Sequence, residues 1–210
     1  MTHHDMVRGD AGVLDVLIRV LAPAALLGCA AIAGPVQGQA LVPPEPEERV
    51  AFLEPPLGVD GRYVVIRLEE NHLYLVEGRT VLWDAPVATG TGFRLETGGQ
   101  EWEFDTPRGV FRVERKEKDP VWIMPDWAFH ERGEPVPPPD SPLRRVPRTL
   151  GSAAIYIGYE LAIHGTDRPE LVLNPDPEAR RISHGCIRMT DESARRLFHD
   201  VDVGTLVLIY

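Results

Sequence analysis

Short runs of β-branched and aromatic residues, each followed by a turn, fill most of the chain after Arg62. Branched and aromatic side chains favour strands because they pack well on a pleated surface, so these runs predict a mostly β domain. The expected strands are Tyr63–Leu68, Leu73–Val76, Thr80–Thr89, Val110–Val113, Ala154–Ile157, Leu161–Ile163 and Thr205–Tyr210.

One helix is expected, from Thr190 to Asp200, with Thr190 suited to its N-cap position. Four apolar residues share one face of this helix: Ala194, Leu197, Phe198 and Val201. Between Asp126 and Arg148, by contrast, the sequence contains six prolines. Proline cannot donate a hydrogen bond to a sheet, so this segment is expected to be a long loop that serves as a lid or a binding wall.

The first forty residues have the pattern of a secretory signal peptide. Arg8 and Arg19 precede an apolar run, Val20 to Gly34, which is too short to span a bilayer comfortably. The small residues of Gly38-Gln39-Ala40 then suit a signal peptidase. The sequence therefore predicts a signal peptide over residues 1–40, a mature chain that begins at Leu41, and a periplasmic location.

A second route to the same compartment is open, because Leu26-Leu27-Gly28-Cys29 resembles the lipobox of bacterial lipoproteins. In that case Cys29 would carry the lipid anchor and become the N-terminus. The apolar character continues beyond Cys29, where a lipoprotein usually turns polar, so cleavage after Ala40 is favoured. Residues 41–60, rich in proline and glutamate, are expected to form a stiff, solvated linker to a folded domain at 61–210.

The composition restricts the class of partner. Hydrophobic residues make up 43% and charged residues 26% of the chain, as in an ordinary globular protein. The formal net charge is -10 at pH 7. Binding to DNA or RNA depends on neutralising phosphates, so this charge disfavours nucleic acid as a partner.

The cysteine count draws attention to Cys186. The chain has two cysteines, Cys29 and Cys186, and removal of the signal peptide would leave Cys186 alone. A lone cysteine in an exported protein cannot form an internal disulfide, and its thiol is either buried or has chemistry to perform. Cys186 is therefore a candidate nucleophile.

The segment Ser183-His184-Gly185-Cys186 surrounds this thiol with residues that suit nucleophilic catalysis. A nearby imidazole lowers the pKa of a thiol and carries its proton. Gly185 lets the backbone approach a substrate carbonyl, where the N–H groups of Gly185 and Cys186 could form an oxyanion hole. A second imidazole, His164, ends an expected strand at a Gly165-Thr166 turn. The remaining histidines of the folded domain are interpreted as ordinary polar residues: His72, His130 and His199.

A zinc site is the alternative for the same residues. His164, His184 and Cys186 offer the donor types of a three-ligand catalytic zinc site. Their spacing matches no standard zinc motif, and no carboxylate is arranged around them in the sequence. The sequence therefore disfavours a zinc site at these residues.

Two segments, Ile163-His164-Gly165-Thr166 and Ser183 to Met189, resemble the signature of L,D-transpeptidases with a YkuD-type catalytic domain. Further similarity spans roughly Gly61 to Tyr210 and includes Val64–Val76, Thr106–Phe111, Trp122–Pro125 and Leu150-Gly151. The resemblance implies a YkuD-like β-sandwich with short helices and one C-terminal helix after the cysteine. The chain departs from the pattern in two places. Eighteen residues, 165–182, separate His164 from Ser183, and Asp191 stands where asparagine is frequent.

The resemblance also implies a role for each residue of the signature. Cys186 would be the nucleophile and His164 the proton donor and acceptor. His184 and Ser183 would hold the geometry of the site, while Gly185 and Cys186 would supply oxyanion donors. Arg188 would either contact a substrate carboxylate or brace the loop.

The implied reaction is peptidoglycan L,D-transpeptidation, which cross-links or remodels the cell wall and so affects cell shape. Cys186 would attack the carbonyl that joins an L-configured centre to the terminal D-amino acid of a tetrapeptide stem. An amine of a second stem, or of a wall-anchored lipoprotein, would then take the acyl group from the thioester. The resemblance further implies inhibition by carbapenems.

Two other functions stay open. Water as the acceptor would make the chain an L,D-carboxypeptidase or hydrolase on the same scaffold. A non-catalytic wall-binding module is the third possibility, but such a module would be expected to have lost Cys186 or His164.

N-terminal sequencing of the protein from the periplasm of a Gram-negative host tests the expected export. The charged start, the apolar run and the small residues before Leu41 predict cleavage after Ala40, so the mature chain should begin at Leu41. A mature form that begins with acylated Cys29 would contradict this cleavage site and establish the lipoprotein route.

Overall fold

The computed structural model describes residues 61–158 and 160–210. The expected signal peptide, lipobox and linker fall within residues 1–60 and so lie outside the described residues. No helix in the described ranges is long and apolar enough to cross a membrane.

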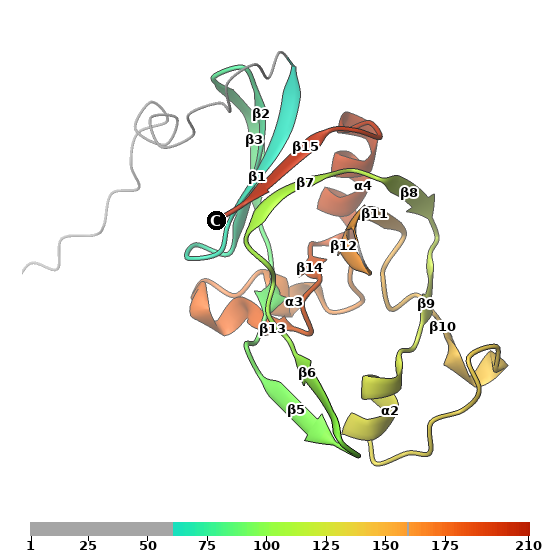
Figure 1. Cartoon of the computed structure of the whole chain (residues 1–210). Coiled ribbons are helices and arrows are strands. Elements are labelled where there is room, and N and C mark those ends of the chain that lie inside the picture. Colours follow the sequence, from blue (N-terminus) through green and yellow to red (C-terminus); the bar gives the residue numbers. More distant parts are fainter. Residues whose placement is uncertain (1–60, 159) are drawn as a thin grey trace, which may run out of the picture. The chain divides into compact units, whose positions relative to one another are not determined.

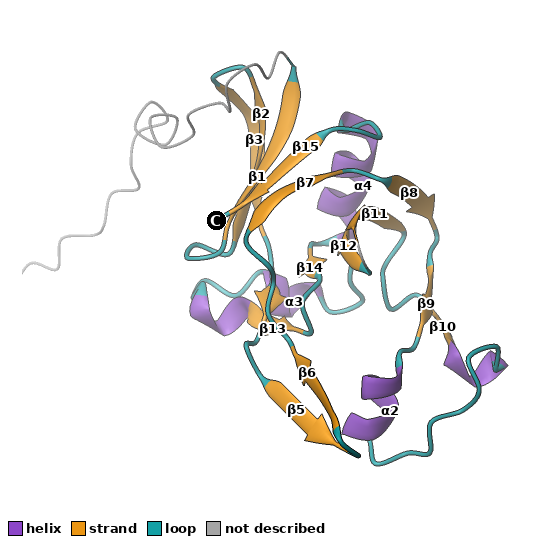
Figure 2. Cartoon of the chain, in the orientation of Figure 1, coloured by secondary structure: helices purple, strands orange, loops and turns teal. Residues whose placement is uncertain are grey.

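Two β-sheets form the body of the domain (Figures 1 and 2). The first has the order β3-β2-β1-β15-β7, with β1 at Arg62–Arg67, β2 at His72–Glu77, β3 at Thr80–Pro86, β7 at Gly109–Arg112 and β15 at Leu206–Ile209. The second has the order β14-β12-β11-β8, with β8 at Arg115–Lys118, β11 at Ala153–Gly158, β12 at Leu161–His164 and β14 at Ile187–Arg188. The expected mostly β sandwich is confirmed.

Three two-stranded pairs complete the strands (Figure 2). They are β4 (Thr89–Gly90) with β13 (Arg181–Ser183), β5 (Arg94–Thr97) with β6 (Gln100–Glu103), and β9 (Val121–Ile123) with β10 (Arg145–Pro147). The sequence predicted Thr80–Thr89 as one strand, whereas the structure ends β3 at Pro86 and begins β4 at Thr89. This break lets β4 leave the five-stranded sheet and pair with β13, directly before the candidate nucleophile.

One apolar core is shared by the two sheets and the C-terminal helix. From the first sheet it takes Val64, Ile66 and Val207; from the second, Ile155, Ile163 and Ile187; and from the helix, Ala194 and Leu197. The opposite face of the first sheet carries a second buried cluster that includes Tyr63 and Val65. Strand β1 is thus buried on both faces, which explains why its sequence is a continuous apolar run without alternation.

The C-terminal helix, α4 (Asp191–Asp200), begins where the sequence predicted. Thr190 is its N-cap, and the Thr190 Oγ1 accepts a hydrogen bond from the Ser193 N–H at 3.2 Å. The structure adds short helical segments that the sequence did not predict: α2 (Asp126–Glu131), α3 (Pro169–Val172), and the 3-10 turns η1 (Pro142–Arg144) and η2 (Glu178–Arg180). Each is too short to show a helical period in the sequence.

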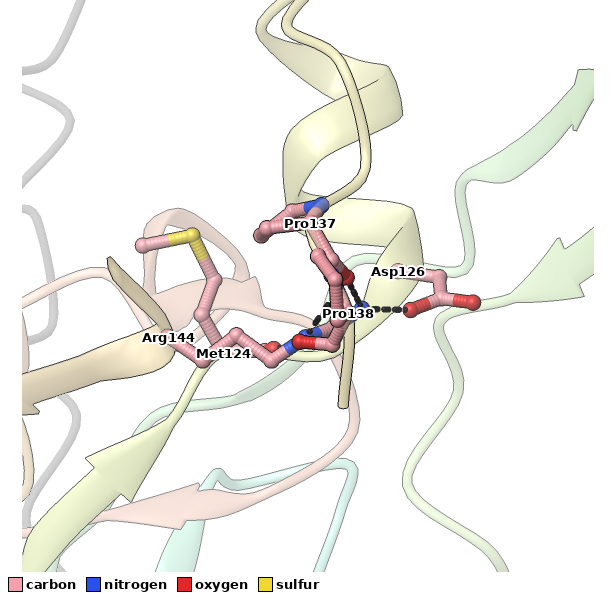
Figure 3. A network of polar contacts seen from close by, with 5 residues as sticks. All are labelled: Met124, Asp126, Pro137, Pro138 and Arg144. Atoms are coloured by element: carbon pink, nitrogen blue, oxygen red, sulfur yellow. Dashed lines mark hydrogen bonds and ion pairs between the residues drawn. The ribbon is translucent and has the colours of Figure 1, made fainter. Parts of the chain in front are cut away.

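The proline-rich segment, residues 126–148, is more regular than the expected long loop, since it contains α2, η1 and β10. Arg144 is 6% exposed and lies at its centre (Figure 3). Its guanidinium donates to the carbonyls of Met124 at 2.8 Å and Pro137 at 2.7 Å, and pairs with Asp126 at 2.6 Å. The prolines of this segment have no N–H group to donate, so the guanidinium of Arg144 donates hydrogen bonds to the backbone carbonyls instead.

The variant Arg144→Ala tests this account of the proline-rich segment. It leaves several carbonyls without a donor, and removing one partner of a buried ion pair costs about 3–5 kcal/mol. Because the side chain of Asp126 stays 49% exposed to water, we expect a loss in the free energy of unfolding of about 2–4 kcal/mol. Hydrogen exchange should accelerate mainly between residues 121 and 147.

The exposed Arg132 at the end of α2 provides the matched control, Arg132→Ala. This variant should exchange like the unmodified protein. Equal exchange in the two variants would show that the segment keeps its fold without the guanidinium of Arg144.

Candidate active site

Cys186 and His164, far apart in the sequence, lie on neighbouring strands. Strand β12 ends at His164, and it pairs in parallel with β14, which begins directly after Cys186. The register aligns Ile163 with Ile187 and His164 with Arg188. The structure thus brings the predicted nucleophile and the predicted base to adjacent strands of the four-stranded sheet.

His164 is 3% exposed and has a defined tautomer. Its Nδ1 lies 2.6 Å from the Gly165 carbonyl oxygen, which can only accept, so Nδ1 carries the proton and Nε2 keeps its lone pair. Burial lowers the pKa of His164 to about 4, and the nearby charge of Arg188 acts in the same direction. At neutral pH the ring is therefore uncharged, with Nε2 able to accept a proton.

The Cys186 thiol is half-buried, and burial raises its pKa above the usual value. A backbone hydrogen bond from Ala162 and the charge of Arg188 lower the pKa of Cys186 but do not outweigh burial. The Cys186 Sγ donates a hydrogen bond to the Glu160 carbonyl oxygen at 3.5 Å. Within the described residues, the Sγ makes no hydrogen bond with the His164 ring. The two pKa shifts favour a protonated thiol and a neutral imidazole over the charged pair.

Ser183 fixes the loop that carries the thiol. It is fully buried, and its Oγ donates to the Cys186 carbonyl at 2.6 Å while accepting from the Gly185 N–H at 3.2 Å. The Gly185 N–H, expected as an oxyanion donor, is therefore already engaged. The N–H of Cys186 has no acceptor within the part of the chain that the structure describes, and it remains as the candidate donor.

Thr106 holds the same loop from its other side, a role that the sequence did not assign. Its Oγ1 donates to the Gly185 carbonyl at 2.7 Å and accepts from the Gly90 N–H at 2.9 Å. Gly185 has φ +116°, and a Cβ there would lie 3.1 Å from the Asp105 carbonyl oxygen, so only glycine suits this position. The signal that could have revealed Thr106 was the Thr106-Pro107 turn within the resembling segment.

His184 lies against α2. Its ring stacks on Trp127, with centroids 4.2 Å apart and planes at 21°, and Phe104 packs edge-on at 4.5 Å. The His184 Nε2 is 3.1 Å from both carboxylate oxygens of Glu131. His184 therefore links the nucleophile loop to the proline-rich segment, through partners that the sequence did not single out.

Arg188 combines a fixed backbone with an available guanidinium. Its N–H and C=O each pair with Ala88, both at 2.8 Å. Burial lowers the pKa of Arg188, and the nearby charges of Cys186 and Asp167 raise it. Among the described residues the guanidinium of Arg188 makes no hydrogen bond and no ion pair.

The long connection between His164 and Ser183 is folded onto the first hairpin. It contains α3 and η2, and Asn71, which is fully buried, donates to the Pro177 carbonyl at 2.6 Å. Arg180 donates to the carbonyls of Asn174 and Glu70. These hydrogen bonds thus tie the connection to the turn between β1 and β2.

Asp191 packs against the turn that orients His164. Its Oδ1 accepts from the Ser152 N–H at 2.8 Å, and a Cβ at either Gly151 or Gly165 would clash with that oxygen. Gly165 is the residue whose carbonyl fixes the His164 tautomer. Asp191 therefore contacts the residue that follows His164 and restricts both nearby positions to glycine.

The surroundings of the loop include a cavity and, within the described residues, no metal-ligand cluster. Within residues 61–158 and 160–210, no three histidine, cysteine or acidic side chains are grouped so that they could hold a metal ion. A cavity of about 380 Å³ adjoins the loop. It is lined by Gly90 and Thr106, which hold the loop, and by Arg108 and Arg181.

Comparison with known proteins supports the resemblance. The YkuD family, described as the L,D-transpeptidase catalytic domain, matches residues 61–209. The probable L,D-transpeptidase YbiS of Escherichia coli K12 is 35% identical over 154 residues, covering 69% of this chain but 43% of YbiS. The putative L,D-transpeptidase YqjB of Bacillus subtilis is 30% identical over 155 residues, 70% of each chain. The match to YbiS spans less than half the length of that protein.

Solved structures share the fold. The crystal structure of an L,D-transpeptidase from Xylanimonas cellulosilytica matches with a TM-score of 0.52 at 23% identity, over 74% of this chain and 63% of that one. The NMR structure of the catalytic domain of the Enterococcus faecium L,D-transpeptidase matches with a TM-score of 0.50 at 22% identity, over 73% and 99%. Since the family match also covers more than half of the sequence, the chain belongs to the YkuD family of L,D-transpeptidase catalytic domains.

Proposed function

We propose that this chain is a peptidoglycan L,D-transpeptidase that transfers an acyl group from a tetrapeptide stem to an amine through a thioester on Cys186. The observation that carries the proposal is the parallel pairing that sets Cys186 beside β12 and His164, with Arg188 acting on the pKa of both. Membership of the family supports the class of reaction. Cross-linking or remodelling of the cell wall, and thereby cell shape, is the proposed role.

Acylation begins from the neutral pair. The His164 Nε2 takes the thiol proton as Sγ attacks the carbonyl before the terminal D-amino acid, and the Cys186 N–H donates to the developing oxyanion. An imidazolium at His164 is disfavoured by burial and by Arg188, so the ring passes the proton on to the leaving nitrogen. The C–N bond breaks, the D-amino acid departs, and the acyl group remains on Sγ.

Deacylation reverses the proton path. An amine attacks the thioester, His164 takes a proton from that amine, and the C–S bond breaks to return the thiol. Amines of a second stem and of a wall-anchored lipoprotein are the proposed acceptors. Water at the same point would give an L,D-carboxypeptidase or hydrolase, the second candidate function. A wall-binding module without catalysis is disfavoured because Cys186 and His164 are both present in the site.

The supporting roles follow from the contacts. Ser183 and His184 hold the loop, Gly185 permits its close approach to Asp105, and Arg188 offers its guanidinium to a substrate carboxylate. Neither a metal nor an organic cofactor is needed for these steps. The proposed organisation is a signal peptide over 1–40, a linker over 41–60 and a catalytic domain over 61–210, acting in the periplasm, with a lipid anchor at Cys29 as the alternative.

Product analysis with disaccharide tetrapeptides tests the reaction and its metal independence. Purified protein should release the terminal D-amino acid and form cross-linked dimers. A chelator should leave turnover intact, because no step uses a metal, whereas a thiol-alkylating agent should abolish it. Loss of turnover on chelation, with recovery on adding zinc, would overturn the mechanism.

Active-site variants test the residue roles. A carbapenem should acylate Cys186, and peptide mapping should place the adduct on the peptide that contains it. Cys186→Ala should lose both the adduct and turnover, since no other cysteine occurs in the described chain. His164→Ala should lose roughly 10²- to 10⁴-fold in turnover, the usual range for general acid–base catalysis.

Two further histidine variants complete this comparison. His199→Ala, at an exposed position on α4, is the matched control and should keep near-normal turnover. His184→Ala should impair both acylation and turnover, because its ring ties the loop to α2. The assignment of His164 is wrong if His164→Ala turns over normally while His184→Ala is inactive.

A further inference from the structure

The tip of the hairpin between β11 and β12 touches the nucleophile. The Sγ of Cys186 donates to the main-chain carbonyl of Glu160 at 3.5 Å. Glu160 has φ +55°, which is uncommon for a residue with a side chain, and the ladder beside it shifts register between Tyr156 and Gly158. Such irregularities change the direction of the chain at functional sites, and here they bring the main chain of Glu160 to the thiol.

The Glu160 side chain is exposed and unpaired. Within the described residues, its carboxylate makes no hydrogen bond and no ion pair, in contrast to Glu117 on the neighbouring β8, which pairs with Arg115. An unpaired carboxylate at the surface keeps its negative charge available to a ligand.

Glu160 and Arg188 place opposite charges near the thiol. After burial, which has the largest effect on the pKa of Cys186, the charge of Arg188 lowers this pKa and that of Glu160 raises it. A substrate acylated on Sγ would therefore have a carboxylate and a guanidinium within electrostatic reach. This arrangement is suited to a ligand with an anionic and a cationic group.

The two competing acceptors differ in charge. Water is neutral, whereas an aliphatic amine is mostly an ammonium ion at neutral pH. A carboxylate at the site raises the local concentration of a cation and offers it a charge-assisted hydrogen bond, but gives water no comparable advantage.

We propose that Glu160 is a specificity-determining residue that favours an ammonium-bearing acceptor over water at the Cys186 thioester. The inference rests on the proposed acyl transfer. Glu160 binds the ammonium, the amine releases one proton to solvent, and its lone pair attacks the thioester carbonyl. The new C–N bond forms as the C–S bond breaks, His164 takes the second proton from nitrogen, and the sulfur is reprotonated.

Partitioning of the thioester tests the proposal. The protein is supplied with a disaccharide tetrapeptide donor and two competing nucleophiles, glycinamide, which is largely cationic near neutral pH, and hydroxylamine, which is uncharged. Mass spectrometry then measures the ratio of glycinamide product to hydroxylamine product. Because the ratio is internal to each sample, a change in the amount of folded protein does not alter it.

Glu160→Gln should lower this ratio roughly three- to tenfold, the range expected for one solvent-exposed charge-assisted contact. Glu160→Lys should lower it further by repelling the cation. Raising the salt concentration should lower the ratio in the unmodified protein and have little effect in Glu160→Gln, since salt screens an exposed charge. Glu69→Gln is the matched control, because Glu69 is an exposed glutamate in the turn after β1, in the other sheet.

The outcomes separate the two levels of the proposal. If the unmodified protein releases no D-amino acid and forms no thioester, the proposed function is wrong. If it forms the thioester and both products, but Glu160→Gln keeps the ratio of Glu69→Gln, the role of Glu160 is wrong while the transpeptidase assignment stands.

Discussion

The position of the nucleophile depends on a strand of two residues. Ile187 and Arg188 make up β14, which is held by β12 on one side and by the bridge to Ala88 on the other. Ile187 is fully buried in the core that both sheets share. The loop before it is then fixed by Ser183 and Thr106, so the thiol is placed by main-chain pairing and by hydrogen bonds to its own backbone.

Burial has the largest effect on the pKa of both Cys186 and His164. The same buried surroundings lower the pKa of His164 and raise the pKa of Cys186, so both shifts oppose a resting thiolate–imidazolium pair. Arg188 works against burial at the cysteine and with it at the histidine. Charge separation would therefore be confined to the moments when a substrate carbonyl accepts negative charge.

The sequence predicted the elements whose signal is local. Strand β1 and helix α4 are examples, because the first is a β-branched run and the second has a capping threonine and an apolar stripe. Strand β8, Arg-Lys-Glu-Lys, has no apolar pattern and becomes a strand only through its pairing with β11. Helix α2 was missed because it is too short to show a helical period, and it is held by contacts with distant residues, among them the hydrogen bond that Arg144 donates to Asp126.

The same distinction applies to the site. Cys186 and His164 were predicted as site residues from the lone cysteine and from the resemblance of the segments around them to the L,D-transpeptidase signature, and their roles stay predictions. The contacts of Glu131 and Glu160 with the site could not be predicted from the sequence, since no local pattern distinguishes these two residues among the 32 acidic residues of the chain. Their significance arises only when folding brings one to the His184 ring and the other to the Cys186 thiol.

The raised pKa of Cys186 also bears on the durability of the protein. Peroxides and disulfides react with the thiolate, so a cysteine that stays protonated at rest is oxidised slowly. The described chain offers no second cysteine that could rescue a sulfenic acid by forming a disulfide. Burial of the thiol thus slows the oxidation of Cys186, because it favours the protonated form over the reactive thiolate.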